Sequence, residues 1–277
     1  MRILILTNDN FFSHAVLRSF LAARRRDLVG IVFSDALVGK RGTTDSLRWV
    51  LQNTGWRHFC FKTAVYGVFR LWNRLMAWLP DNRCVSSTWL WATRNEVPVF
   101  RSADINAPAF VEKVRGLDPE LTVSVSMNQI VKEALRSVPR FGSINVHNAP
   151  LPRYAGMSPY VWALANGEDH SAATIHYIEE GLDVGDILVQ EKVPVRPRES
   201  SFNLFWRCCV VAGWLLCDTV DSIEAGTQTA YPQDLSKQSY FSWPTKEAVR
   251  QLRLRGHRLA RIGDFGRALC GGRPRGL

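Results

Sequence analysis

The feature that most constrains this 277-residue chain is an alternation, near its start, of short apolar runs with an amphipathic stretch. Residues 2–6 and 28–33 are apolar runs of strand length, rich in Ile, Leu and Val. Between them, residues 12–25 place apolar side chains at helical spacing. This strand–helix–strand order predicts the beginning of a parallel sheet with helices on its faces.

The rest of the chain extends this pattern. Residues 7–12 (TNDNFF), which follow the first predicted strand, lack the GxGxxG pattern of a dinucleotide site. We predict an α/β fold with an open, mostly parallel, Rossmann-like sheet flanked by helices and followed by a short basic C-terminal extension. Further strands are predicted at 96–100, 119–126, 141–147 and 173–178, and further helices at 130–138, 202–223 and 246–259.

Composition limits the class of protein. The chain is 46% hydrophobic and 22% charged, which excludes a mainly disordered protein. No uninterrupted apolar run approaches the roughly 18–20 residues that span a bilayer, and the apolar run at the start is too short for a signal peptide. Six cysteines without CxxC spacing indicate reduced thiols rather than a zinc site. We therefore expect a cytoplasmic protein without a metal.

The net charge of +10 is unevenly placed. Residues 40–94 have nine basic and two acidic side chains (9 − 2 = +7), and residues 246–277 have the same counts. Both segments either attract an anionic partner, namely nucleic acid, anionic lipid or a phosphorylated small molecule, or form solvated faces. The first segment is also rich in tryptophan at helical spacing. It is interpreted as packing on the core, with an oligomer interface or an anionic membrane surface as alternatives.

A group of polar residues follows the strand predicted at 141–147. Asn145 and His147 are two apart, so their side chains share one face at the strand's carboxyl end, where open α/β sheets bind ligands. A loop stiffened by Pro150 and Pro152 comes next, and Asp183 later lies on a tight loop between two glycines. Each feature alone is more often structural. Together they predict a functional site.

The segment 144–188 resembles the catalytic core of the 10-formyltetrahydrofolate-dependent formyltransferases. In that family an Asp follows the Asn of Asn-x-His by 38 residues, and here 183 − 145 = 38. The stretch 181–188 (GLDVGDIL) is most similar to the methionyl-tRNA branch of the family. The resemblance covers residues 1–35 and 95–195.

The resemblance implies roles for three catalytic residues. Asn145 would donate a hydrogen bond to the oxyanion of a tetrahedral intermediate. His147 would stabilise that oxyanion when protonated, or take up the amine proton when neutral. Asp183 would orient a water and favour the charged imidazole. The co-substrate implied is 10-formyltetrahydrofolate, and no metal is required.

The resemblance also implies binding residues. Folate contacts are expected from two loops, comprising Met127, Asn128, Gln129, Ile130, Val131, Glu180 and Gly181. Acceptor contacts are expected from Pro150, Leu151, Pro152, Arg153 and Tyr154. Because the loop after His147 reads Asn-Ala-Pro-Leu-Pro instead of the family's Pro/Gly-Ser-Leu-Leu-Pro, the acceptor is expected to differ from the familiar ones.

The segment after the core bears on both the domain boundaries and the acceptor. Residues 1–225 are predicted to form the catalytic domain, with 40–94 as a basic, Trp-rich helical insert. Residues 226–277 form a basic extension that is too short for a comfortable β-barrel. The favoured acceptor is a small phosphorylated or nucleotide-linked amino sugar, and methionyl-tRNA is the alternative. Two further functions are compatible with the sequence: hydrolysis of the formyl-folate, and a non-catalytic role as a folate-fold protein that binds a ligand or a membrane. The sequence leaves the oligomeric state open.

Overall fold

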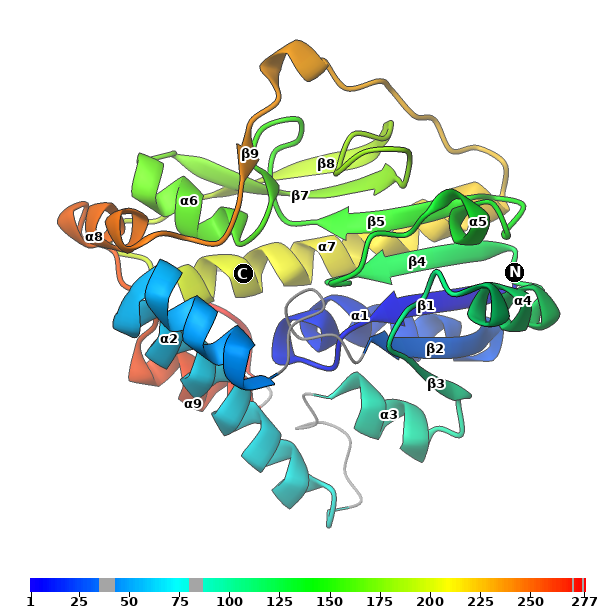
Figure 1. The fold of residues 1–277 in the computed structure, drawn as a ribbon, viewed down its shortest axis with the longest axis horizontal. Coiled ribbons are helices and arrows are strands. Elements are labelled where there is room, and N and C mark those ends of the chain that lie inside the picture. The colour runs from blue at the N-terminus through cyan, green and yellow to red at the C-terminus, as the bar shows by residue number, and fades with distance from the viewer. Residues whose placement is uncertain (35–42, 80–86, 271, 276) are drawn as a thin grey trace.

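The computed structural model describes residues 1–34, 43–79, 87–270, 272–275 and 277 (Figure 1). A seven-stranded sheet in the order β3-β2-β1-β4-β5-β7-β8 forms its centre. The first five strands of that order are parallel, and the last two are antiparallel to their neighbours. The expected open, mostly parallel sheet is thus confirmed. The strands are β1 (Ile3–Thr7), β2 (Leu28–Ser34), β3 (Val99–Ser102), β4 (Leu121–Val125), β5 (Ser143–His147), β7 (His170–Tyr177) and β8 (Ile187–Pro194).

The strand order creates a crevice in the middle of the sheet. The chain leaves β1 for β2 and β3 on one side, then crosses to β4 and β5 on the other. All five residues of β1 and of β4 are buried, because helices cover both faces of the sheet. In an open sheet of this kind, ligands bind at the carboxyl ends of the strands where the order reverses.

Two long helices cover one face. These are α1 (Phe11–Arg24), which the short helix η1 (Arg25–Asp27) follows, and α7 (Ser201–Glu224). Gly213 brings α7 and α1 close together, because a Cβ there would lie 2.5 Å from the Val16 carbonyl oxygen. Among the described residues, α7 alone is long and apolar enough to cross a membrane, which the sequence interpretation did not anticipate. However, 61% of its most apolar window is buried inside the protein, as in a core helix.

The opposite face is covered by α4 (Pro108–Leu117) and α5 (Glu133–Arg136), which pack on apolar side chains of β1 and β2. The helix predicted at 130–138 is only four residues long. The Asn106 side chain accepts a hydrogen bond from Lys132 N–H at 2.9 Å and donates one to the Ile130 carbonyl. These bonds hold residues 130–132 outside the helix, and Pro139 cannot extend it.

The insert consists of α2 (Thr43–Met76) and α3 (Thr88–Arg94), within the part of it that is described. Gly55, at φ 79°, kinks α2. Beyond the kink, Phe61, Val65 and Phe69 enter the core beside α1. In contrast, Leu71, Leu75 and Trp78 are exposed, so the expected packing of the insert on the core holds for one side of the helix only. Figure 1 shows the end of α2 projecting away from the sheet. The strand predicted at 96–100 begins only at Val99, because Val97 N–H donates to the Ala92 carbonyl in the turn after α3.

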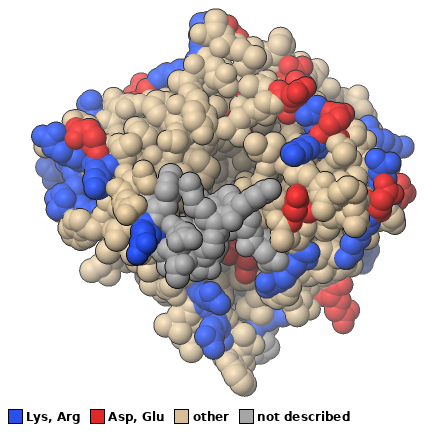
Figure 2. Space-filling model, viewed as in Figure 1, with Lys and Arg blue, Asp and Glu red and all other residues tan. Residues whose placement is uncertain are grey.

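The C-terminal residues pack on the rest of the molecule. The C-terminal elements are η2 (Leu235–Lys237), β9 (Tyr240–Phe241), α8 (Lys246–Leu254) and α9 (Ile262–Leu269). The elements that β9 and α8 contact are β6 (Ala155–Gly156) and α6 (Pro159–Asn166). β9 pairs with β6, and α8 packs on α6. The helix predicted at 246–259 ends at Leu254, because Gly256 (φ 83°) adopts the left-handed conformation that stops a helix. Basic side chains gather over α8, at the left edge of Figure 2.

Candidate active site

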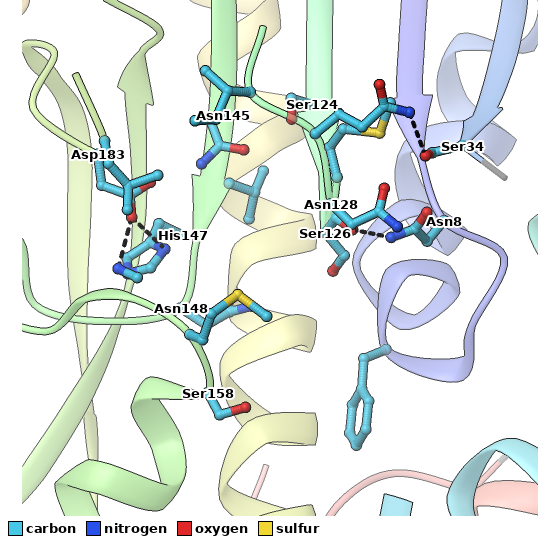
Figure 3. A pocket seen from close by; sticks show the side chains of 18 of the residues that line it. Asn8, Ser34, Ser124, Ser126, Asn128, Asn145, His147, Asn148, Ser158 and Asp183 are labelled. Carbon is cyan, nitrogen blue, oxygen red and sulfur yellow. Dashed lines mark hydrogen bonds and ion pairs between the residues drawn. The ribbon is translucent and has the colours of Figure 1, made fainter. Parts of the chain in front are cut away.

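A cavity of about 670 Å³ opens at the carboxyl ends of β1, β4 and β5. Asn145, His147 and Asp183 lie on one side of it, and Asn8, Ser126 and Asn128 face them from the other (Figure 3). The three predicted catalytic residues, which span 38 residues of sequence, are therefore brought together. The cavity lies at the switch in strand order, where the topology predicts a ligand.

Asn145 is held by a histidine that the sequence analysis did not single out. Its amide Nδ2 lies 3.2 Å from His176 Nε2, on the neighbouring strand β7. Burial lowers the pKa of His176 to about 4, so the ring is neutral near pH 7. Its Nδ1–H donates to the Tyr177 carbonyl, which leaves Nε2 as an acceptor for one amide hydrogen of Asn145. The second amide hydrogen remains for a ligand. The β7 register opposite Asn145 was the signal that could have identified His176.

His147 is fixed at the end of β5. Its Nε2–H donates to the Tyr154 carbonyl at 2.9 Å. In the neutral ring Nδ1 then carries the lone pair, and it lies 3.7 Å from Asp183 Oδ2. The His147 side chain is about nine-tenths buried. An imidazole in this position can accept a proton while the carboxylate beside it stabilises the resulting cation.

Asp183 is held in a strained turn by distant parts of the chain. Its φ of 56° is left-handed, and its Oδ2 accepts a hydrogen bond from Gly156 N–H at 2.9 Å. The Gln233 side-chain amide donates to the carbonyls of Asp183 and Gly185. Since Gln233 is 50 residues further along, no local sequence pattern indicates this contact. The carboxylate is thereby oriented by two segments that the sequence analysis did not assign to the site.

The expected folate residues divide into two groups. Residues 127–131 and Gly181 line the cavity, whereas Glu180 does not. The side-chain amide of Gln129 already has two hydrogen-bond partners: it donates to Ser34 Oγ at the end of β2 and accepts from Ile105 N–H after β3. It therefore connects the ends of these strands. In contrast, Asn128 Oδ1 is buried without a partner in the described structure. An unpaired buried acceptor on the wall of a cavity is suited to a ligand N–H donor.

The expected acceptor residues 150–154 do not line the cavity. Leu151 is buried with Ala155 and Ile187 behind it. The Tyr154 ring stacks on Phe241, and its hydroxyl donates to Glu168. The loop thus positions His147 through the Tyr154 carbonyl. The lining on this side comes instead from Asn148 and from residues 156–160.

The far wall of the cavity comes from the insert and the C-terminal segment. Lys62 of α2 lines it and donates to the Tyr160 hydroxyl at 3.0 Å. Its Nζ lies 5.8 Å from the centre of the Trp243 ring. Among the described residues, the Tyr160 hydroxyl is the hydrogen-bond partner of Lys62. The wall therefore places a cation beside aromatic rings, and no ion pair joins Lys62 to a carboxylate of the described residues, an arrangement suited to an anion.

Fold and site together define a class: an open α/β protein whose switch-point cavity holds a free amide N–H, an imidazole and a carboxylate. The chain belongs to the formyl transferase family, whose model matches residues 82–220. Methionyl-tRNA formyltransferase of Geotalea uraniireducens is 36% identical to it over 156 residues, which are 56% of this chain and 50% of that protein. The chain thus spans about half the length of the curated relatives it matches.

Solved structures share the fold. An N-formyltransferase from Helicobacter canadensis, solved with folinic acid and dTDP-3-aminofucose, aligns over 91% of this chain and 80% of its own. The TM-score is 0.59 and the identity 16%. Glycinamide ribonucleotide transformylase 1 from Symbiobacterium toebii aligns over 84% of this chain and 94% of its own, with a TM-score of 0.56 and 15% identity.

Proposed function

We propose that the protein transfers a formyl group from 10-formyltetrahydrofolate to the amine of a small phosphorylated or nucleotide-linked acceptor such as an amino sugar. One observation supports formyl transfer most. The free N–H of Asn145, the lone pair of His147 and the carboxylate of Asp183 converge on one side of a single cavity. Family membership agrees with this proposal.

The reaction begins when the acceptor amine attacks the formyl carbon. A new C–N bond forms, and the carbonyl oxygen becomes an oxyanion. Asn145 donates its second amide hydrogen to that oxygen, while its first remains on His176. Because the amide is already oriented before the charge develops, it needs little reorganisation, which is the condition for efficient stabilisation of an oxyanion.

A proton must then move from the attacking nitrogen to N10 of the folate. His147 Nδ1 accepts it, directly or through a water oriented by Asp183, and the carboxylate stabilises the imidazolium. Return of the proton to N10 accompanies cleavage of the old C–N10 bond. The products are the formamide and tetrahydrofolate, and His147 is again neutral.

The folate would lie along residues 126–131 and the loop 179–183. Asn128 Oδ1, buried and unpaired, is suited to accept a hydrogen bond from an amino or ring N–H of the pterin. Ile130, which is exposed in this structure, would supply an apolar contact.

Lys62 supports an acceptor that carries a phosphate. Partial burial of a cation is unfavourable unless an anion or hydrogen-bonding groups compensate, and the Tyr160 hydroxyl is the one hydrogen-bond partner that Lys62 has among the described residues. A phosphate or diphosphate on the acceptor would pair with it. Tyr66 and Trp243 line the same wall and could flank a base or sugar.

The proposal is tested by the release of tetrahydrofolate, followed by absorbance, with amino-sugar nucleotides, charged initiator tRNA or water alone as acceptor. Turnover with an amino-sugar nucleotide is expected, with a fall in kcat of about 10²–10³ for Asn145→Asp. Folate affinity should be retained in that variant. Turnover with water alone would replace transfer by hydrolysis, and no turnover together with no folate binding would contradict the proposal.

The acceptor is tested separately with Lys62→Met and Lys62→Arg. We expect Lys62→Met to raise KM for a phosphorylated acceptor by about tenfold or more with little change in kcat, and Lys62→Arg to retain most affinity. An unchanged KM would exclude a phosphate contact at Lys62.

Methionyl-tRNA is the second candidate acceptor, because the matched relative is named as a methionyl-tRNA formyltransferase. The basic helix α8 would be a contact for tRNA phosphates. Activity on charged tRNA that falls steeply with salt, as the release of counterions requires, would favour this acceptor over an amino sugar.

A further inference from the structure

The outer side of α2 is a line of apolar side chains that no described residue covers. Trp56, Leu71, Leu75 and Trp78 are 62%, 60%, 54% and 89% exposed. Between the first two, exposed Cys60, Ala64 and Gly67 continue the same line at steps of four and three residues. We call these seven residues the outer stripe. Six of them follow one face of α2, and Trp78 lies in the turn directly after the helix.

The opposite side of the same helix is also apolar, and it is covered. Phe61, Val65 and Phe69 lie in the protein core at 7% exposure or less. A globular surface helix normally has one apolar side and one polar side, whereas a helix that is apolar on both sides is buried on both. The outer stripe therefore has the composition of a surface that contacts something outside this chain.

The charged residues of the segment that carries the outer stripe have one sign between residues 46 and 80. Residues 46–80 contain four arginines, one lysine and no acidic residue. Arg57, Arg70 and Arg74 are exposed on the half of α2 that carries the stripe. Arg94 adds a cation at the helix end, where its guanidinium donates to the Met76 carbonyl at 2.6 Å. The occupant of this surface must therefore be apolar where it meets leucine and tryptophan, and anionic around them.

We propose that α2 lies on an anionic phospholipid bilayer, with the outer stripe in the boundary between headgroups and acyl chains. Leucine and tryptophan on one side of a helix, flanked by arginine without acidic residues, are the features of a helix that binds in the membrane interface. The projecting end of α2, tan with a patch of blue at the bottom of Figure 2, can reach a flat surface before the sheet does.

Two other occupants fit less well. A second copy of this chain, packed stripe to stripe, would bring Arg70 and Arg74 of both copies together, and residues 46–80 offer no carboxylate to pair with them. Nucleic acid would satisfy the arginines but would leave Leu71 and Leu75 without an apolar partner. A bilayer with anionic headgroups satisfies both groups, because it offers acyl chains and phosphates at adjacent depths.

This surface is distinct from the cavity. Lys62 and Tyr66 of α2 face the cavity, whereas the outer stripe points away from the core. The surface does not depend on the formyl transfer proposed above, so its test requires no turnover.

The test is co-sedimentation of the full chain with phosphatidylcholine vesicles, with and without about one third phosphatidylglycerol. We expect binding to the anionic vesicles, weakening at high salt, and little binding to the neutral ones. The double variant Leu75→Gln/Trp78→Gln should lose about tenfold or more of the vesicle affinity, since both side chains are exposed and neither supports the core.

The matched control is Trp214→Gln, which removes a tryptophan that is 47% exposed on α7 rather than on α2. It should bind vesicles as the unmodified protein does. Arg70→Gln/Arg74→Gln should weaken binding to anionic vesicles only. Failure to bind anionic vesicles would overturn the proposal, as would a particle mass in light scattering that doubles in the unmodified protein and returns to one chain in Leu75→Gln/Trp78→Gln.

Discussion

Asn145 shows how a single side chain depends on its neighbour in the sheet. An asparagine at a strand end could rotate its amide freely, but His176 accepts one of its hydrogens. Because burial keeps His176 neutral, Nε2 stays an acceptor near pH 7. His176 therefore acts through Asn145 as a positioning residue, and its Nε2 also lies 3.7 Å from Asp183 Oδ1.

We expect His176→Phe to lower kcat by about ten- to a hundredfold, because the Asn145 amide loses its fixed orientation. Tetrahydrofolate release measures kcat, and folate binding and the melting temperature should change little. His176→Gln, whose side-chain oxygen can accept the same hydrogen bond, should restore part of the rate. Equal rates for His176→Phe and the unmodified protein would show that Asn145 needs no such support.

His58, on the buried side of α2, concerns stability instead. Neither ring nitrogen has a partner in the described structure, and burial, with Lys62 nearby, lowers the pKa of His58 to about 3. The folded protein therefore stays unprotonated at His58 as the pH falls, while the unfolded chain takes up a proton near the ordinary pKa of 6.5. Stability is lost between about pH 6.5 and pH 3 as a result.

We expect His58→Phe to raise the free energy of unfolding by about 1 kcal/mol at neutral pH, because an unpaired polar ring becomes apolar. It should also reduce the loss of stability between about pH 7 and pH 5. Urea denaturation at both pH values gives the comparison. A variant that is less stable than the unmodified protein would indicate that the His58 ring has a hydrogen-bonding partner, such as a bound water.

At the scale of elements, the sequence predicts what depends on local pattern. The buried strands and the helices at 12–25 and 202–223 follow from runs and spacing, and the fold agrees. Pro139 and the Asn106 side chain shorten the helix predicted at 130–138, and Gly256 ends the one predicted at 246–259. The site follows the same rule. Asn145, His147 and Asp183 were indicated by spacing and family resemblance, whereas Lys62, His176 and Gln233 enter through contacts between distant segments.

The close approach of α1 and α7 gives a prediction about elements. Gly213→Ala should destabilise the protein by about 1–3 kcal/mol, because its Cβ would lie 2.5 Å from a backbone oxygen of α1. Gly67→Ala in α2 is the matched control, since nothing lies within 4 Å of its added Cβ. It should stabilise the helix by about 0.5–1 kcal/mol. Urea denaturation of both variants should give opposite signs, and a neutral Gly213→Ala would show that the helices can separate without cost.

At the scale of the molecule, the segment after α7 completes the cavity. Tyr240 and Trp243 line it, and β9 pairs with β6 beside the His147 loop. Gly156 makes that pairing possible, because a Cβ there would lie 2.3 Å from the Phe241 carbonyl oxygen. Residues 226–277, which the sequence predicts as a basic extension separate from the catalytic domain, thus contribute a wall of the site.

A substitution of Gln233 can distinguish the contribution of the C-terminal segment to the site from its contribution to the stability of the whole protein. Within the described structure, its side-chain hydrogen bonds go to the carbonyls of Asp183 and Gly185, so Gln233→Ala should free the Asp183 loop while leaving the core packing intact. We expect kcat to fall by about tenfold, with a change in the free energy of unfolding of no more than about 1 kcal/mol. Deletion of residues 226–277 should differ, because it removes Ala248 and Leu252 from contact with α6 and exposes an apolar surface. If Gln233→Ala kept full activity while the deletion lost it, the segment would support the fold without orienting Asp183.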